Sequence, residues 1–309
     1  MESEQLSLIG VIPEIKVENE QEMAEICGAL YRGGLPAAEI FVPAAGLDRI
    51  IEKVRRQAPE MILGAAGIQN AEQADCAIAA GASYIAAPVL DEALVRCCQQ
   101  KDELLIFCAQ NADDARAAAA LGVKTIKLCR KEDLEALQTE DAAFLLAGCV
   151  SANNICAYLR LPQVAAVCGS WMIPEDAVKA RDWDSVEKCA KETVEQILGL
   201  ELKHVGINSG SPEQALADAE RLCSLLGWQV RNGNKSIFAG SAFECMKLPF
   251  RGTHGHVAIG VNDVKRAMWH LQRRGFSFDE SSAGYKDGKM NAIYLNEEIA
   301  GLAFHLLQK

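Results

Sequence analysis

Eight short apolar runs alternate with longer segments of helical periodicity in the first 200 residues of the chain. Continuous apolar strands that alternate with helices indicate a parallel sheet covered on both faces. Eight such units in this length predict a closed (β/α)8 TIM barrel. The alternative is an open doubly wound sheet, but no GxGxxG loop follows the first run. The runs lie at 8–13, 38–43, 61–67, 84–89, 104–109, 125–129, 143–149 and 164–173.

The pattern changes near Gly199, after a segment at 182–198 that is typical of a closing helix. Beyond it, apolar residues alternate with polar ones and glycines mark turns, which favours short amphipathic strands. We therefore expect two domains, a barrel over 1–199 and a smaller domain over 200–309.

An internal repeat organises the second domain. KHVGIN at 203–208 matches GHVAIGV at 255–261, and a helical segment follows each of them. Two or three short strands then lead to AFECMK at 242–247 and AFHLLQ at 303–308. A single βαβββ module would leave an apolar sheet face exposed, so the repeat predicts two modules that pack together as a smaller α+β domain.

Histidine is confined to the last third of the chain, because none of the five histidines lies in the first 203 residues. Any chemistry in the predicted barrel must use other side chains, which excludes a Ser-His-Asp triad and a histidine-based metal site there. The net charge of -11 argues against nucleic acid as a partner.

No run of about 18 or more apolar residues is present, so we expect no membrane partner. The first residues, MESEQLSLIG, lack the basic region and the apolar core of a secretory signal. The chain has twelve cysteines, and without an export signal they indicate reduced thiols and a cytoplasmic protein.

Two charged residues interrupt the centres of the predicted barrel strands, Glu39 and Lys127. They fall on the second and sixth runs, which lie roughly opposite each other in an eight-stranded barrel. A lysine desolvated inside a barrel has a lowered pKa, so we expect a neutral amine that can form an imine with a ketone. A nearby carboxylate can then move protons on the intermediates. The alternative is a buried ion pair that only stabilises or specifies the core.

Sequence motifs along the barrel occur in the order and spacing of a known enzyme family. They are GVIPEI, GGLPAAEI, LGAAGIQNAEQ, AAGASYIAAPVLDEAL, VKTIKL, GCVSANNICAYL and CGSWMIP. On these motifs, residues 8–191 resemble the family of 2-keto-3-deoxy-6-phosphogluconate (KDPG) and 4-hydroxy-2-oxoglutarate (KHG) aldolases. The resemblance implies a class I aldolase that cleaves a 2-keto-4-hydroxy acid to pyruvate and an aldehyde without a cofactor. It also implies a small-molecule keto acid as partner and a homotrimer as oligomer.

Site residues carry over from this resemblance by position. Lys127 corresponds to the Schiff-base lysine and Glu39 to the proton-shuttling glutamate. Gly148, Gly169 and Ser170 fall where the family binds phosphate or carboxylate through backbone amides and a hydroxyl.

The sequence departs from the family in the part of the site that binds substrate. The arginine that follows the glutamate by four residues in the enterobacterial type is Pro43 here, and Arg130 beyond the lysine strand could replace it. The threonine of the usual GAGT is Gly67. Two hypotheses stay open: an aldolase with a changed or smaller substrate, and a catalytically impaired barrel that acts as a small-molecule-binding or regulatory protein. Other changed pairs are Phe107-Cys108, Cys129-Arg130, Gly148-Cys149 and Cys168-Gly169.

The repeat of the second domain resembles the glyoxalase-like module of the vicinal oxygen chelate superfamily. In that superfamily the first and last strands of each module supply metal ligands. By position these are His204, Glu244, His256 and His305. Three imidazoles and a carboxylate suit a divalent metal with an open coordination position, although the last ligand is more often a glutamate. The alternative is a cup that binds a small ligand without metal. By analogy alone, the fusion suggests a regulatory or substrate-sensing role.

Overall fold

The protein is described by a computed structural model that covers residues 2–17, 19–41, 46–137 and 141–309. The chain divides into two compact units, Met1–Ile197 and Leu198–Lys309. None of the helices in the described ranges combines the length and the apolar character that crossing a bilayer requires.

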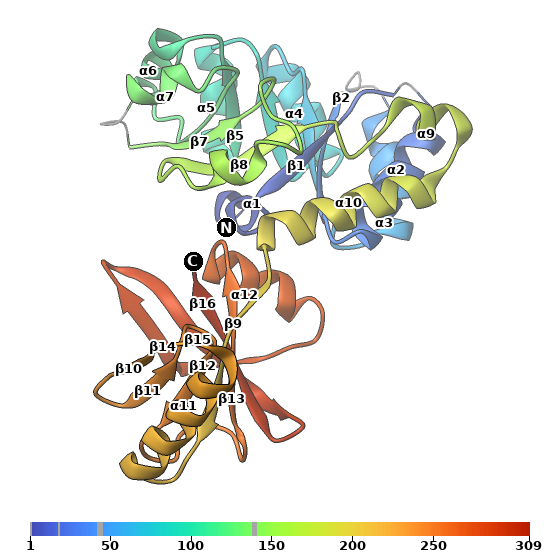
Figure 1. The fold of residues 1–309 in the computed structure, drawn as a ribbon. Helices are drawn as coiled ribbons and strands as arrows, with labels where there is room; N and C mark the ends of the chain where they lie inside the picture. Colours follow the sequence, from blue (N-terminus) through green and yellow to red (C-terminus); the bar gives the residue numbers. More distant parts are fainter. Residues whose placement is uncertain (1, 18, 42–45, 138–140) are drawn as a thin grey trace. The chain divides into compact units, whose positions relative to one another are not determined.

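The first unit is a closed barrel of eight parallel strands, which pair in chain order from β1 to β8 (Figure 1). Helices alternate with the strands, as the apolar pattern predicts, and each of the eight predicted runs overlaps a strand. The TIM-type barrel is therefore confirmed. The strands are β1 Val11–Ile15, β2 Ala37–Phe41, β3 Ile62–Ala66, β4 Tyr84–Ala87, β5 Leu105–Ala109, β6 Thr125–Leu128, β7 Ala143–Leu146 and β8 Val164–Gly169. The helices are α1 Glu2–Ile9, α2 Glu20–Arg32, α3 Leu47–Gln57, α4 Ala71–Ala79, α5 Glu92–Gln100, α6 Ala112–Ala120, α7 Glu132–Glu135, α8 Ile155–Leu159, α9 Glu175–Ala180 and α10 Trp183–Leu198.

Polar side chains cap several of the barrel helices at their first turn. Those of Asn19, Asn70, Asp91 and Asn111 accept hydrogen bonds from backbone N–H groups of α2, α4, α5 and α6. Such caps satisfy amides that have no partner within the helix, so they fix where each helix begins after its strand. The helix expected at 182–198 is α10.

The first strand begins later than the sequence predicts. Residues up to Ile9 belong to α1, which contacts β1 and β8 and buries Leu6 and Ile9 completely or nearly so. The expectation of a strand at 8–13 is wrong at its start, because a buried helix end and a buried strand share the same apolar composition. As β1 runs from Val11 to Ile15, Glu14 lies within the strand, beyond the predicted run at 8–13.

The second unit is an eight-stranded sheet in the order β10-β11-β12-β9-β13-β16-β15-β14. It consists of two βαβββ modules, as the repeat predicts. In each module the first and last strands pair in parallel, and β9 and β13 join the modules as antiparallel neighbours. The first module comprises β9 Glu201–Asn208, α11 Pro212–Leu226, β10 Val230–Asn232, β11 Ser236–Ala239 and β12 Phe243–Met246. The second comprises β13 Gly255–Val261, α12 Val264–Gln272, β14 Phe278–Lys286, β15 Lys289–Ile299 and β16 Leu302–Gln308.

The two faces of this sheet carry different side chains. On one face α11 packs against β11 and β12, where Ala219, Cys223 and Cys245 belong to a small buried core. Because side chains alternate along a strand, Glu244 points to the face opposite its neighbour Cys245. The central strands can therefore present polar groups on one face while they pack against helices on the other.

Candidate active site

Lys127 and Glu39 meet inside the barrel. Lys127 lies on β6 and Glu39 on β2, and Nζ of the lysine donates to Oε1 of the glutamate at 2.7 Å and also to Oε2. Lys127 is 3% exposed and Glu39 is 1% exposed. The predicted contact between Lys127 and Glu39 is therefore present, and it is buried from solvent.

A second carboxylate faces the same ammonium group. Glu14 on β1 accepts a hydrogen bond from Lys127 Nζ, with Oε1 at 3.3 Å. One carboxylate oxygen of Glu14, one of Glu39 and the Sγ atom of Cys168 on β8 all lie within 4.8 Å of one another. Neither Glu14 nor Cys168 was predicted as a site residue. The available signal was the charge of Glu14 within an otherwise apolar strand.

These neighbours determine the protonation state of Lys127. Burial by itself lowers the pKa of an amine, but Cys168, Glu39, Cys108 and Glu14 together outweigh it, and the pKa of Lys127 is raised well above its ordinary value. The expectation of a lowered pKa is wrong for the resting site, because it took account of burial without the charges. Burial also raises the pKa of Glu39, which makes this carboxylate a better acceptor for the lysine proton.

Tyr84 places a buried hydroxyl in the same part of the barrel. It lies on β4, in register with Gly64 on β3, which is in turn in register with Glu39. A Cβ at Gly64 would lie 2.1 Å from two ring carbons of Tyr84, so the glycine provides the space for the ring. The Tyr84 hydroxyl has no hydrogen-bond partner among the described residues. Burial raises the pKa of Tyr84 well above its ordinary value, so the hydroxyl keeps its proton and can donate it.

The predicted anion-binding residues follow the carboxyl ends of β6, β7 and β8. Gly148 comes after β7 with a φ of 71°, and Gly169 ends β8 directly before Ser170. Arg130 comes after β6 and donates two hydrogen bonds to Asp133, at 2.9 and 3.0 Å. The carboxyl ends of barrel strands form one rim, so these residues belong to the side of the barrel where active sites occur.

One of the departures from the family concerns the same rim. Gly67 follows β3 with a φ of 81°, and a Cβ built there would have none of the described residues within 4 Å. The described residues therefore leave space next to the position of the usual threonine. Pro43 lies outside the described residues.

The four predicted metal-binding residues converge on one face of the second unit. Oε2 of Glu244 lies 3.1 Å from Nε2 of both His204 and His256, and these two Nε2 atoms are 3.2 Å apart. Ring nitrogens of His204, His256 and His305 all lie within 4.8 Å of one another. Each residue comes from one of four neighbouring central strands, in the order β12, β9, β13 and β16.

The register of the central strands explains this convergence. Gly206 pairs with both Glu244 and His256, and Ala258 pairs with His305. Because Gly206 and Ala258 are small, the imidazole rings can extend over the neighbouring strands. A Cβ at Gly206 would lie 2.0 Å from Cε1 of His256.

The histidines of this cluster have unsatisfied nitrogens. Both ring nitrogens of His305 and Nδ1 of His256 are buried without a partner in the part of the chain that the structure describes. Burial and the neighbouring His256 lower the pKa of His305 to about 4, so its imidazole is neutral. Burial by itself raises the pKa of Glu244, but hydrogen bonds from His204, His256 and Ser236 hold it below its usual range. The group thus combines neutral imidazole with carboxylate, the forms that bind metals.

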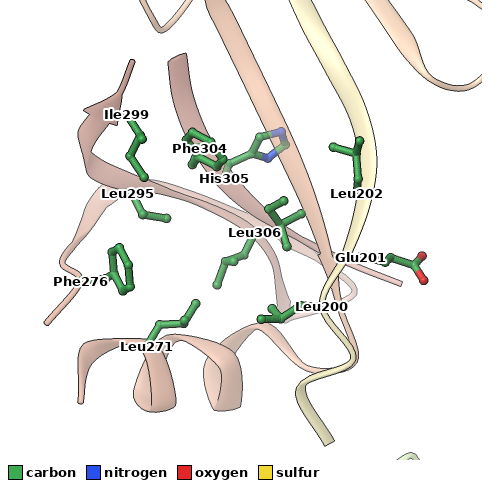
Figure 2. A pocket seen from close by; sticks show the side chains of 11 residues that line it. Leu200, Glu201, Leu202, Leu271, Phe276, Leu295, Ile299, Phe304, His305 and Leu306 are labelled. Atoms are coloured by element: carbon green, nitrogen blue, oxygen red, sulfur yellow. The ribbon is translucent and has the colours of Figure 1, made fainter. Parts of the chain in front are cut away.

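An apolar pocket of about 310 Å³ lies beside His305 in the second unit (Figure 2). Phe304 and Leu306 flank this histidine on β16 and line the pocket together with Leu271 of α12. Since side chains alternate along a strand, Phe304 and Leu306 point to the face opposite the imidazole. The pocket is therefore separate from the histidine cluster, although His305 borders both.

Comparisons with known proteins concern the barrel unit. A sequence model of the KDPG and KHG aldolase family matches residues 3–189. The 2-dehydro-3-deoxy-phosphogluconate aldolase of Treponema pallidum is 27% identical over 205 residues, which cover 64% of this chain and 97% of that protein. The KHG/KDPG aldolase of Escherichia coli is 28% identical over 193 residues, which cover 60% of this chain and 91% of that protein.

A solved structure supports the barrel fold independently. KDPG aldolase from Legionella pneumophila, with pyruvate captured at low pH as a covalent carbinolamine intermediate, aligns with a TM-score of 0.57 and 23% identity. The alignment covers 62% of this chain and 98% of that one. The family match spans more than half of the 309 residues and includes Glu14, Glu39 and Lys127. The chain therefore belongs to the KDPG and KHG aldolase family and is a carbon–carbon lyase.

Proposed function

We propose that the barrel unit is a Schiff-base aldolase that cleaves a 2-keto-4-hydroxy acid, such as KDPG or KHG, to pyruvate and an aldehyde. Lys127 is the Schiff-base lysine and Glu39 is the general acid and base. The buried contact between Lys127 Nζ and Glu39 carries the proposal. The names of the relatives support these substrates. The family resemblance adds a homotrimer, which light scattering of the purified protein would measure.

The lysine–glutamate contact supports a defined order of proton transfers. Glu39 accepts a proton from the Lys127 ammonium, and the neutral amine adds to the C2 carbonyl of the keto acid. The carbinolamine loses water and leaves an iminium ion. A carboxylate of the site removes the proton of the C4 hydroxyl. The C3–C4 bond then breaks and the aldehyde leaves. The electron pair of that bond converts the iminium ion to an enamine. Protonation of C3 by Glu39 and hydrolysis release pyruvate and restore the lysine.

The substrate anion is assigned to the rim of the barrel. Gly148, Gly169 and Ser170 offer backbone N–H groups and a hydroxyl, and Arg130 offers a planar guanidinium that can donate two parallel hydrogen bonds. Because Arg130 is bound to Asp133, a substrate phosphate has to compete with that carboxylate. We therefore expect Arg130 to contribute less to phosphate binding than an unpaired arginine would.

Reductive trapping tests the aldolase proposal. Pyruvate and borohydride should leave a covalent adduct on Lys127, located by mass spectrometry of the digested protein. Lys127→Arg keeps the positive charge but should form no adduct, because a guanidinium is not a nucleophile at neutral pH. The matched control is Lys124→Arg, which changes an exposed lysine paired with Asp141. An unlabelled wild-type protein would instead favour a barrel that binds small molecules without catalysis.

For the second unit we propose a glyoxalase-like domain that binds a divalent metal through His204, Glu244, His256 and His305. A tetrahedral ion with bonds of about 2.1 Å separates its ligand atoms by about 3.4 Å. The separations of 3.1 and 3.2 Å among Glu244, His204 and His256 are close to that value. The buried, unpartnered nitrogens of His305 would gain a ligand role. A metal bound there would polarise an oxygen atom of a small ligand.

Metal analysis of the purified protein tests this second proposal. We expect close to one zinc, nickel or manganese ion per chain, and loss of that ion in His256→Ala. His254→Ala is the control, because His254 is exposed and precedes β13. Metal well below one ion per chain, together with unchanged thermal stability of His256→Ala, would leave a cup that binds small ligands without metal.

A further inference from the structure

One lysine in the barrel faces two carboxylates on neighbouring strands. The Cα atoms of Glu14 on β1 and Glu39 on β2 are register partners. Both side chains accept from Lys127 Nζ, Glu39 through two oxygens and Glu14 through Oε1 at 3.3 Å. The proposed aldolase chemistry gives a named role to Glu39 and none to Glu14, so the second carboxylate is unexplained by it.

The two carboxylates differ in their access to solvent. The side chain of Glu39 is 1% exposed, whereas that of Glu14 is 14% exposed. A proton on Glu39 has to leave through a neighbouring group, but a proton on Glu14 can exchange with water. Glu14 also makes the longer of the two contacts with Nζ, which leaves its second oxygen free of the lysine.

We propose that Glu14 is a second catalytic carboxylate of the Lys127 site, which protonates the oxygen that leaves during Schiff-base formation and is then reprotonated from solvent. This assignment rests on the proposed function, because it needs Lys127 to form the Schiff base. In the step, the Glu14 carboxylic acid gives its proton to the carbinolamine hydroxyl, and the C–O bond breaks to release water. The lone pair of the lysine nitrogen forms the C=N bond. An iminium ion on Lys127 and a Glu14 carboxylate remain.

The charges of the site favour a proton on one of its two carboxylates during this step. With Lys127 protonated and both carboxylates ionised, the three groups carry a net charge of minus one, and a keto acid brings a further negative charge. Like charges in one site raise the affinity of a carboxylate for a proton. Burial raises the pKa values of the Cys168 and Cys108 thiols, so neither supplies the missing proton readily. The titratable or charged groups around Glu14 are Glu39 on β2, Tyr84 on β4, Cys108 on β5, Lys127 on β6, Cys168 on β8 and Lys16 directly after β1.

The rate of adduct formation tests the assignment without knowledge of the aldehyde. The full-length protein is mixed with pyruvate and quenched with borohydride at successive times, and mass spectrometry follows the adduct at several pH values. Glu14→Gln keeps the shape of the side chain but has no proton to give, so we expect adduct formation to slow by about tenfold or more. The amount of adduct formed by Glu14→Gln should still reach that of wild type. In wild type we expect adduct formation to slow as the pH rises, and this slowing should be absent from Glu14→Gln. Glu14→Asp should restore a decline toward high pH, with its midpoint shifted from that of wild type because the ordinary pKa of aspartate differs from that of glutamate. Glu92→Gln on the surface of α5 is the control.

The outcomes separate this assignment from the proposed function. A wild-type protein that forms no adduct overturns the Schiff-base function, and the role of Glu14 with it. Wild-type adduct with a Glu14→Gln rate within about twofold, and an unchanged pH profile, overturns the role of Glu14 alone. If Glu14→Gln does not fold, the Glu14→Asp variant decides: an unchanged pH profile there contradicts the assignment, and a shifted profile supports it.

Discussion

Gly206 and His256 are cross-strand partners on β9 and β13, and the imidazole occupies the space where a Cβ of residue 206 would lie. That Cβ would be 2.0 Å from Cε1 and 2.2 Å from Nδ1 of the ring. Atoms in close-packed proteins do not approach so closely, so a larger residue at 206 has to displace the histidine. The position of one proposed metal ligand thus depends on a missing side chain on the neighbouring strand.

Gly206→Ala should therefore lower the metal content and destabilise the protein by about 1–3 kcal/mol through overpacking. Metal analysis and urea unfolding measure the two effects. Gly260→Ala on β13 is the control, since a Cβ there would meet flexible side-chain atoms of Lys203 and Glu201. Full metal occupancy in Gly206→Ala would contradict a ligand role for His256 in this position.

Glu39→Gln should reduce aldol cleavage by a factor of about 10² to 10⁴, the usual contribution of a general acid or base. The fold should persist, because the amide fills the same volume and Glu14 still pairs with Lys127. Deuterium exchange into the methyl group of pyruvate, followed by NMR in D2O, measures proton transfer at C3 directly. Glu52→Gln on α3, an exposed residue, is the control. Exchange at the wild-type rate in Glu39→Gln would assign that proton transfer to another group.

Alkaline stability should depend on Cys27, whose pKa burial raises to about 12 from the ordinary value of 9.0. Below the ordinary pKa, the thiol is protonated in both the folded and the unfolded chain, and its contribution is constant. As the pH rises from about 9 toward about 12, only the unfolded chain ionises, so the free energy of unfolding falls. Cys27→Ala should lose about 1 kcal/mol near neutral pH and then show a weaker decline than wild type.

Urea unfolding of wild type and Cys27→Ala at pH values of about 8 and about 10 measures that difference in slope. Cys76→Ala is the control, because Cys76 is exposed. Equal slopes for wild type and Cys27→Ala would mean that this thiol ionises without unfolding.

Removal of the metal should affect the two units differently. A chelator should lower the thermal stability by up to about 2.7 kcal/mol if the free ion is present at a hundred times its dissociation constant. Pyruvate trapping on Lys127 should continue at the same rate, since Schiff-base chemistry uses no metal. Calorimetry and adduct formation with and without the chelator test both statements. Loss of trapping after chelation would tie the barrel chemistry to the metal and contradict the proposed mechanism.

Arg130→Gln should raise the KM for a phosphorylated keto acid by about tenfold and leave that for an unphosphorylated one unchanged. The estimate follows from hydrogen bonds to a charged group, which contribute about 1.5–3 kcal/mol, reduced by the existing pair with Asp133. Steady-state kinetics with KDPG and KHG provide the comparison, and Arg116→Gln is the control. Equal effects on both substrates would exclude Arg130 as the phosphate ligand.

The eight barrel strands could be predicted because each is a continuous apolar run, and the lysine could be predicted because it interrupts one. The first boundary was misplaced for a physical reason: Leu6 and Ile9 of α1 are as buried as the residues of β1. An apolar run in the sequence indicates buried residues, and here the buried residues continue from the end of α1 into β1. The predicted run also stopped at residue 13, so Glu14, which contacts Lys127, fell outside it.

The raised pKa of Lys127 could not be predicted from its own strand. It depends on carboxylates contributed by β1 and β2, whose distances from Nζ follow from barrel closure. The convergence of the proposed metal-binding residues could be predicted for the opposite reason. His204 and His256 occupy matching places in two copies of one motif, so the repeat itself indicated which residues share a face.

The junction of β9 and β13 has a consequence for the history of the chain. Each module alone holds two of the four ligands, His204 with Glu244 or His256 with His305, and leaves β9 or β13 as an unpaired edge. Two identical copies joined along that edge would form a symmetric dimer with the whole site at their boundary. The internal repeat is the pattern that duplication and fusion of such a self-pairing module would leave. A fused pair permits what two identical copies cannot have: one half carries a carboxylate, Glu244, where the other carries an imidazole, His305.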